Sequence, residues 1–175
     1  GTHFLDNLKN VVNDGSFPMV RGILNSLFIS AALAAICTYF LSLTAYGLYA
    51  YNFKLKKVAF TFIMAILVMP TQVTAMGFLR LITNMGMYDS WAPLIVPSIA
   101  SPAVFYLMYS YLQSSLPISL VEAAKIDGCS DFGFFFKIAI PLSKTIIAVM
   151  CLFYATAMWN QFFNALMFLQ DDGKM

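Results

Sequence analysis

Long apolar runs, separated by short polar segments that carry nearly all of the charge, dominate the chain. Residues 23–51 contain no charged side chain, and residues 58–79 form a second uncharged run that ends at Arg80. Two further apolar runs lie within residues 97–113 and 145–168. A membrane-crossing helix needs about 20 apolar residues. The pattern therefore predicts an all-α, polytopic helical membrane protein with four transmembrane helices over these ranges.

The segments between and around these runs are polar. We expect residues 1–22 to be an extracytoplasmic segment with one short helix, because apolar residues there are mixed with charged ones. Residues 23–170 are predicted to form a single transmembrane domain, with residues 114–144 as a loop that leaves the membrane and returns to it. Residues 171–175 are predicted to be an extracytoplasmic end.

Small and hydroxyl-bearing side chains recur every four residues along the first run. Small groups on one helix face let two helices approach closely in lipid, and hydroxyls can donate hydrogen bonds across the contact. A packing stripe is therefore the favoured interpretation, and lining of a substrate pathway is the alternative. The residues are Ser26, Ser30, Ala34, Thr38 and Ser42.

A proline interrupts the second run. Pro70 lies in its middle and is followed by the polar side chain of Gln72. Proline removes one backbone hydrogen bond and bends a helix, and interrupted helices often surround the binding sites of transporters. A bend satisfied by internal packing explains the pattern equally well. Pro70 and Gln72 are therefore candidates for the lining of a pathway.

Polar and aromatic side chains share one face of the last run. Thr156, Asn160 and Asn164 are spaced by four residues, with Trp159 and Phe163 beside them. Polar groups in lipid are costly unless they are paired or in contact with water. Aromatic faces beside amides suit a sugar ring, which offers C–H faces and hydroxyl edges. Hydrogen bonding between helices is the alternative to a role in lining the pathway.

A short charged helix is predicted inside the loop at residues 114–144. Ser119 and Glu122 have the S-x-x-E spacing of a capping box, in which the two side chains satisfy backbone amides at the helix start. Gly128 is typical of a helix end. Leu120, Ala124 and Gly128 follow at intervals of four and predict an apolar stripe on which another chain could pack. From these residues alone, protein docking and a position on lipid headgroups are both open.

The same segment resembles a known motif. E-A-A-x-x-D-G is followed, thirteen residues after its glycine, by the proline of I-x-I-P-L. This spacing is similar to the EAA loop of the permease subunits of binding-protein-dependent ABC importers, and the flanking runs resemble those of the maltose and multiple-sugar type. The matching residues are Glu122, Ala123, Ala124, Asp127, Gly128, Ile138, Ile140, Pro141 and Leu142.

The resemblance implies a function and partners. Such a subunit would form half of the translocation pathway for a sugar or oligosaccharide in a bacterial or archaeal cytoplasmic membrane. The expected partners are an ABC ATPase dimer, a second permease subunit, an extracytoplasmic solute-binding protein and the lipid bilayer, with no nucleic acid. The resemblance also implies one membrane helix before residue 1 and one after residue 175. The residues expected to couple to the ATPase are Glu122, Ala123, Ala124, Asp127 and Gly128.

The distribution of positive charge predicts the orientation, because cytoplasmic loops of membrane proteins are enriched in lysine and arginine. With four spans, one side carries six such residues and the other carries four. The Lys-rich loops are therefore expected to be cytoplasmic, on the side where an ATPase would bind. The six are Lys54, Lys56, Lys57, Lys125, Lys137 and Lys144, and the four are Lys9, Arg21, Arg80 and Lys174.

Composition and missing motifs argue against other classes of function. The chain is 61% hydrophobic and 10% charged with a net charge of +2, which gives no reason to expect nucleic-acid binding. It contains no G-x-x-x-x-G-K-[ST] loop to hold ATP and a single histidine, so we expect no enzyme, no metal and no cofactor in this chain, with ATP-Mg on the partner ATPase. The remaining alternatives are an importer permease for a peptide, amino acid or ion, a self-contained channel or carrier, and a membrane scaffold.

Overall fold

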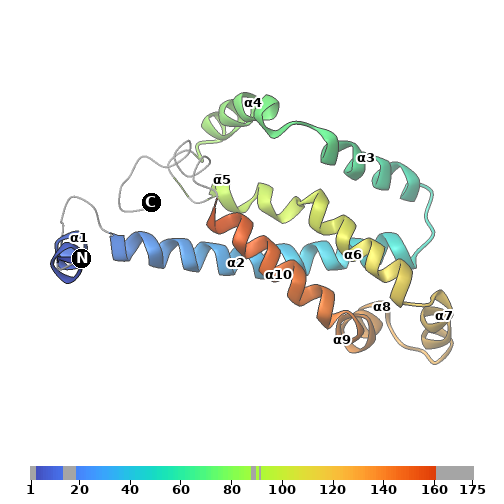
Figure 1. The fold of residues 1–175 in the computed structure, drawn as a ribbon. Coiled ribbons are helices and arrows are strands. Elements are labelled where there is room, and N and C mark those ends of the chain that lie inside the picture. Colours follow the sequence, from blue (N-terminus) through green and yellow to red (C-terminus); the bar gives the residue numbers. More distant parts are fainter. Residues whose placement is uncertain (1–2, 14–18, 88–89, 91, 161–175) are drawn as a thin grey trace.

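A computed structural model gives the fold of the chain and describes residues 3–13, 19–87, 90 and 92–160 (Figure 1). Over these residues the chain is helical and has no strand, which confirms the all-α prediction. The helices are α1 (Phe4–Asn13), α2 (Met19–Ala50), α3 (Lys56–Val68), α4 (Thr71–Asn84), α5 (Ala92–Ile95), α6 (Pro102–Ser115), α7 (Ile118–Ile126), α8 (Asp131–Phe134), α9 (Ile140–Leu142) and α10 (Lys144–Trp159), with a 3-10 turn η1 (Pro97–Ala100) before α6 and a π-helical turn η2 (Phe135–Ala139) after α8.

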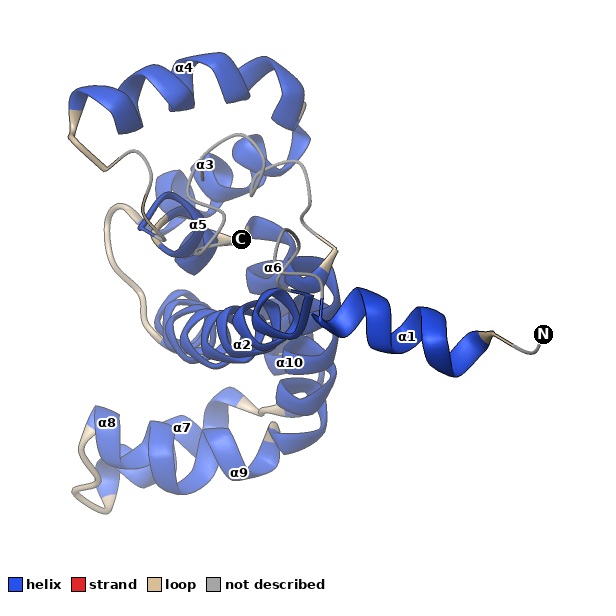
Figure 2. Ribbon diagram, turned by 90° about the vertical axis from the view of Figure 1, so that its left-hand side faces the viewer, coloured by secondary structure: helices blue, strands red, loops and turns tan. Residues whose placement is uncertain are grey.

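Helices α2, α6 and α10 form the centre of the molecule. Helices α3 and α4 lie on one side of them, and α7, α8 and α9 lie on the other (Figures 1 and 2). The core contains fully buried side chains from all three central helices, among them Cys37, Phe105, Met108 and Met150. The short helices of the loop at residues 114–144 lie beside the central helices and contribute buried side chains to the core.

The stripe of small residues on α2 is buried in this core. Ser30, Ala34, Thr38 and Ser42 are each at most 5% exposed. The thiol of Cys151 on α10 lies 3.3 Å from the hydroxyl of Thr38, so the stripe faces α10. The predicted packing role is confirmed for these four residues, whereas Ser26, the first residue of the predicted stripe, is only half-buried.

Helix α2 confirms the first apolar run as one uninterrupted helix. Its 32 residues extend about 48 Å at 1.5 Å per residue. Within the described residues, Val20–Ala50 is the one unbroken helix that is long and apolar enough to cross a membrane. The segments Asp131–Leu142 and Lys144–Trp159 pass the same test together, with a bend of 79° between them. The short helix expected in residues 1–22 is α1.

The second run is broken where a bend was expected. Helix α3 ends at Val68, and Met69 and Pro70 both have extended backbone, with ψ of 128° and 123°. The prediction of one bent helix over residues 58–79 is therefore wrong. The ring of a proline pushes the preceding residue out of the helical region, and proline has no N–H to continue the ladder. Pro70 instead becomes the residue before the first turn of α4.

Prolines also shape the third run. Pro97 begins η1, Ser101 is extended with ψ of 108°, and Pro102 begins α6. The first helical position tolerates proline because its N–H would have no partner there in any case. The fourth run is described as far as Asn160, and the rest of residues 145–168 lies outside the described residues. That these runs cross a membrane stays a prediction.

Candidate functional site

Helix α7 is the short helix predicted inside the loop, and it begins differently from the prediction. It starts at Ile118, with Pro117 in extended conformation before it and no side chain capping its start. The predicted capping box is wrong, because the helix begins early enough that Ser119 already lies inside the first turn. The amide of Leu120 bonds to the carbonyl of Pro117 at 3.0 Å instead. Glu122 is therefore a mid-helix residue and does not fix the helix start.

The end of α7 is formed as predicted at Gly128. This glycine has φ of +75°, a conformation that costs other residues energy. Its amide donates to the carbonyl of Lys125 at 3.1 Å, and the amide of Cys129 donates to the carbonyl of Ala124 at 2.9 Å. These two bonds form a Schellman motif, which satisfies carbonyls that the helix leaves without partners. Gly128 thus turns the chain sharply away from the helix axis.

The faces of α7 divide its apolar residues. Val121 and Ala124 are buried and belong to the core of this chain, so the predicted outward stripe of Leu120, Ala124 and Gly128 is wrong at its centre. Residues three apart share a helix face, and that pairing turns Ala124 inward with Val121. Leu120 and Ala123 are exposed, and Ile126 is 86% exposed. The surface open to another chain is therefore the one that carries these last three residues.

A groove of about 510 Å³ separates α7 from the ends of α2 and α6. Glu122 and Lys125 line it from α7, facing Tyr109 and Gln113 of α6. Within the described part of the chain, the side chain of Glu122 makes no hydrogen bond or ion pair. Its carboxylate is thus available for contacts with groups from outside the described chain. Lys56, also in the groove, is committed to bonds with the Tyr49 carbonyl at 3.2 Å and the Asn52 side-chain oxygen at 3.4 Å.

Lys125 is held by groups from two other segments. Its ammonium lies 4.3 Å from the centre of the Tyr51 ring and 3.7 Å from a carboxylate oxygen of Asp131. Tyr51 follows the end of α2, and its hydroxyl is 3.4 Å from that of Tyr46. The ring of Tyr51 therefore lies between the cation and the buried Tyr46.

Two tyrosine hydroxyls bond to backbone carbonyls at the two ends of the loop. Tyr49 of α2 donates to the carbonyl of Leu116, directly after α6, and Tyr111 of α6 donates to the carbonyl of Leu142 at 3.1 Å. The loop is thus tied to the central helices before and after α7. The sequence analysis assigned no role to Tyr49, or to Tyr46 and Tyr51 near Lys125. Their clustering at the end of an apolar run was the available signal, because tyrosines gather at membrane boundaries.

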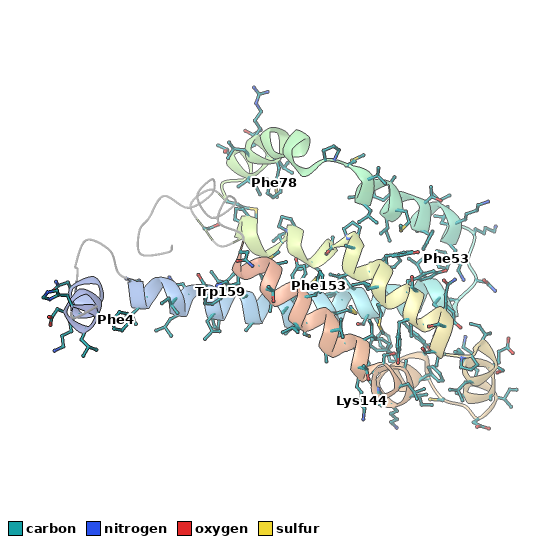
Figure 3. All side chains as sticks on the ribbon, viewed as in Figure 1. Phe4, Phe53, Phe78, Lys144, Phe153 and Trp159 are labelled. Carbon is teal, nitrogen blue, oxygen red and sulfur yellow. The ribbon has the colours of Figure 1, made fainter. Side chains whose placement is uncertain are left out.

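The candidate pathway residues on α10 lie far from α7. Trp159 is at the opposite end of α10 from Lys144, which is beside α9 (Figure 3). Trp159 is 48% exposed. Asn160 donates to the Thr156 carbonyl at 2.9 Å, and the Thr156 hydroxyl donates to the Leu152 carbonyl at 2.8 Å. The structure therefore brings Thr156, Trp159 and Asn160 together on the last turn of the helix.

The other candidates are partly outside what the structure describes. Phe163 and Asn164 lie beyond the described residues. Pro70 is exposed between α3 and α4, and Gln72 is in the first turn of α4, where its side chain is not described. Among the described residues, no interaction joins Pro70 to Thr156, Trp159 or Asn160.

Comparison with known proteins identifies the family. Residues 39–175 match the family described as Binding-protein-dependent transport system inner membrane component. The chain belongs to this family. The resemblance noted from the sequence is therefore confirmed, and membership makes this chain an inner membrane transport component.

Curated relatives agree with this assignment. The Arabinooligosaccharides transport system permease protein AraQ of Bacillus subtilis is 30% identical over 95% of this chain and 58% of its own length. The sn-glycerol-3-phosphate transport system permease protein UgpE of Escherichia coli K12 is 33% identical over 98% of this chain and 62% of its own length. Protein LplC of Bacillus subtilis is 34% identical, over 99% and 57%. This chain thus spans about three-fifths of the length of these relatives.

A solved structure supports the fold. A chain from the crystal structure of a bacterial ABC transporter involved in the import of the acidic polysaccharide alginate aligns with a TM-score of 0.85. The alignment covers 95% of this transport component and 57% of that chain, at 23% identity. This chain therefore shares its fold with that chain of the transporter.

Proposed function

We propose that this chain is part of a permease subunit of an ABC importer. The subunit forms half of the translocation pathway for a sugar or oligosaccharide and couples to a separate ATPase through α7. Its complex contains an ATPase dimer, a second permease subunit and an extracytoplasmic solute-binding protein. Family membership supports the transport role, and the observation that carries the coupling role is the placement of α7.

Helix α7 has the position and surface that a docking element needs. It lies at one end of the molecule, together with α8, α9 and the connection from α2 to α3 (Figure 1). Its outward side chains, Leu120, Ala123 and Ile126, are apolar or small and exposed. Exposed apolar side chains of this kind suit a hydrophobic groove on a partner, which is a common way of recognising a helix.

Charge supports a cytoplasmic location for this end. The connection after α2 carries Lys54, Lys56 and Lys57, and the loop around α7 carries Lys125 and Lys137. Positive residues of short loops favour the cytoplasmic side of a membrane. An ATPase that uses cellular ATP would meet α7 there.

The proposed mechanism is transmission of a displacement. When the ATPase dimer closes on ATP, it moves α7, and the tyrosine bonds to Leu116 and Leu142 pass that movement to α2 and α6. Ala123 allows close contact with the ATPase, Glu122 offers a charged contact beside the groove, and Gly128 sets the angle of the returning chain. The pathway then alternates between outward and inward access.

A sugar is the cargo that the observations favour. Trp159 offers an exposed aromatic face next to the Asn160 amide, and such a pair can contact both the C–H face and the hydroxyls of a sugar. The name of AraQ refers to arabinooligosaccharides. The name of UgpE refers to sn-glycerol-3-phosphate, which makes another small polar solute the second candidate. Uptake of labelled oligosaccharides and glycerol phosphate by the complete transporter would distinguish them.

A cysteine crosslink tests the coupling role. Ala123→Cys should form a disulfide with a cysteine placed in the groove of the co-expressed ATPase, and the yield should change when ATP is added. Ala124→Cys is the matched control, since Ala124 is buried and should not crosslink. The parent chain, with Cys37, Cys129 and Cys151, gives the background.

Three results would contradict the proposal. A membrane-inserted Ala123→Cys protein that never crosslinks would place α7 on lipid headgroups instead. Transport by this chain alone in liposomes would favour a self-contained channel or carrier. A complex that hydrolyses ATP but moves no solute would favour a scaffold.

A further inference from the structure

We propose that Lys125 is a positioning residue that fastens α7 to the end of α2 and to the start of α8. Through this contact a displacement of α7 reaches the buried core without passing along the backbone. The inference rests on the proposed coupling function, and it adds a third connection to the two tyrosine bonds at the ends of the loop.

Three segments meet at the Lys125 ammonium. The lysine belongs to α7, Tyr51 directly follows α2, and Asp131 is the first residue of α8. The ammonium is 4.3 Å from the Tyr51 ring centre and 3.7 Å from Asp131. A cation over an aromatic face is attracted by the negative charge of that face, and the carboxylate adds an opposite charge. One side chain therefore contacts groups from two other segments of the chain.

Aromatic contacts continue from Tyr51 into the core. The Tyr51 ring meets the Tyr46 ring edge to face, with centres 5.8 Å apart and planes at 89°. Tyr46 is buried and stacks on Phe134 at 5.9 Å and contacts Phe135 at 5.4 Å. Packed interiors transmit strain because they contain few voids. The path from Lys125 thus reaches α2 and the segment that leads to α10.

The contact is suited to transmission more than to stability. The Lys125 and Asp131 side chains are 46% and 59% exposed, and ion pairs in such positions contribute little to folding. Loss of the ammonium should therefore leave a folded chain in which α7 moves more freely relative to α2. That outcome separates a positioning role from a purely structural one.

The test uses the complete transporter in liposomes and two variants of one residue. Lys125→Met keeps the apolar stem and removes the charge, and Lys125→Arg keeps the charge for both Tyr51 and Asp131. Three quantities are measured: ATP hydrolysed, solute transported, and the yield of the Ala123→Cys crosslink to the ATPase. Lys125→Met should keep the crosslink while solute moved per ATP falls about 2- to 30-fold, the range of known coupling effects. Lys125→Arg should match the parent.

A second pair tests the aromatic part of the contact. Tyr51→Leu removes the ring and should lower the ratio of solute to ATP as Lys125→Met does, whereas Tyr51→Phe keeps the ring and should change it little. An unchanged ratio in Lys125→Met or Tyr51→Leu would overturn the inference, and so would an equal loss in Lys125→Arg. Failure of the proposed function would look different. The Ala123→Cys protein with Lys125 unchanged would then give no crosslink to the ATPase.

Discussion

The hydroxyl of Tyr111, near the end of α6, donates a hydrogen bond to the carbonyl oxygen of Leu142, the last residue of α9, over 3.1 Å. The chain bends by 79° directly after Leu142, between the segment that ends there and α10. Carbonyls in the last turn of a helix lack partners within it. The tyrosine therefore satisfies a backbone group at the corner where the loop rejoins the central helices.

Removal of this hydroxyl should destabilise the corner. Tyr111→Phe should lower the free energy of unfolding by about 0.5–1.5 kcal/mol, the net contribution of a typical hydrogen bond. The measurement is denaturant unfolding of the detergent-solubilised chain. Tyr106→Phe is the control, because Tyr106 is an exposed residue of the same helix whose hydroxyl makes no hydrogen bond among the described residues. Equal stability of Tyr111→Phe and the parent would show that the bond contributes nothing.

Gly128 should be sensitive to any side chain. A Cβ at this position would meet no atom within 4 Å, so the cost of Gly128→Ala comes from its φ of +75° alone. We expect a loss of about 1–2 kcal/mol. Gly47→Ala is the matched control, since Gly47 also has open space around it but lies within α2, where alanine is favoured by about 0.5–1 kcal/mol. Thermal unfolding should therefore move in opposite directions for the two variants.

Two serines allow a helix start without a side-chain cap to be compared with one that has such a cap. Ser119→Ala should change stability by less than about 0.5 kcal/mol, because α7 has no side-chain cap. Ser130→Ala should cost about 1 kcal/mol, because the Ser130 hydroxyl accepts a bond from the Gly133 amide at 3.1 Å at the start of α8. A larger loss for Ser119→Ala than for Ser130→Ala in the same unfolding assay would restore the capping box predicted from the sequence.

The small-residue stripe should reject bulk. Ala34→Leu inserts three heavy atoms into the buried face of α2 and should cost about 1–3 kcal/mol through overpacking. Ala35→Leu adds the same atoms one position along, where the side chain is exposed, and should be nearly neutral. Unfolding of both variants in detergent measures the difference, and equal effects would mean that α2 does not pack on this face.

The sequence predicted the features that depend on neighbouring residues. Most of the uncharged run at residues 23–51 lies in α2, because a long apolar run without charged residues can form one continuous helix. Gly128 follows the end of α7 because the chain turns away from the helix there, and this turn needs a residue that tolerates positive φ. The pattern E-A-A-x-x-D-G indicated the family because it is followed, thirteen residues after its glycine, by the proline of I-x-I-P-L.

The missed features depend on contacts between distant residues or on competition between local signals. Tyr49 and Leu116 are 67 positions apart, and Tyr111 and Leu142 are 31 apart, so no local pattern could pair them. Either Pro117 or Ser119 could precede the start of α7. The helix begins directly after Pro117, so Ser119 lies inside its first turn. Ala124 turned inward because Val121 shares its face and found space in the core.

The break at Pro70 restricts what can surround that side of the molecule. Amides in the first turn of α4 have no acceptor within the helix, and Pro70 provides no side-chain cap for them. Each unsatisfied amide would cost several kcal/mol in hydrocarbon. Lipid tails are therefore an unsuitable neighbour for this turn. Water or another polypeptide has to meet these amides, so the junction of α3 and α4 needs a polar neighbour.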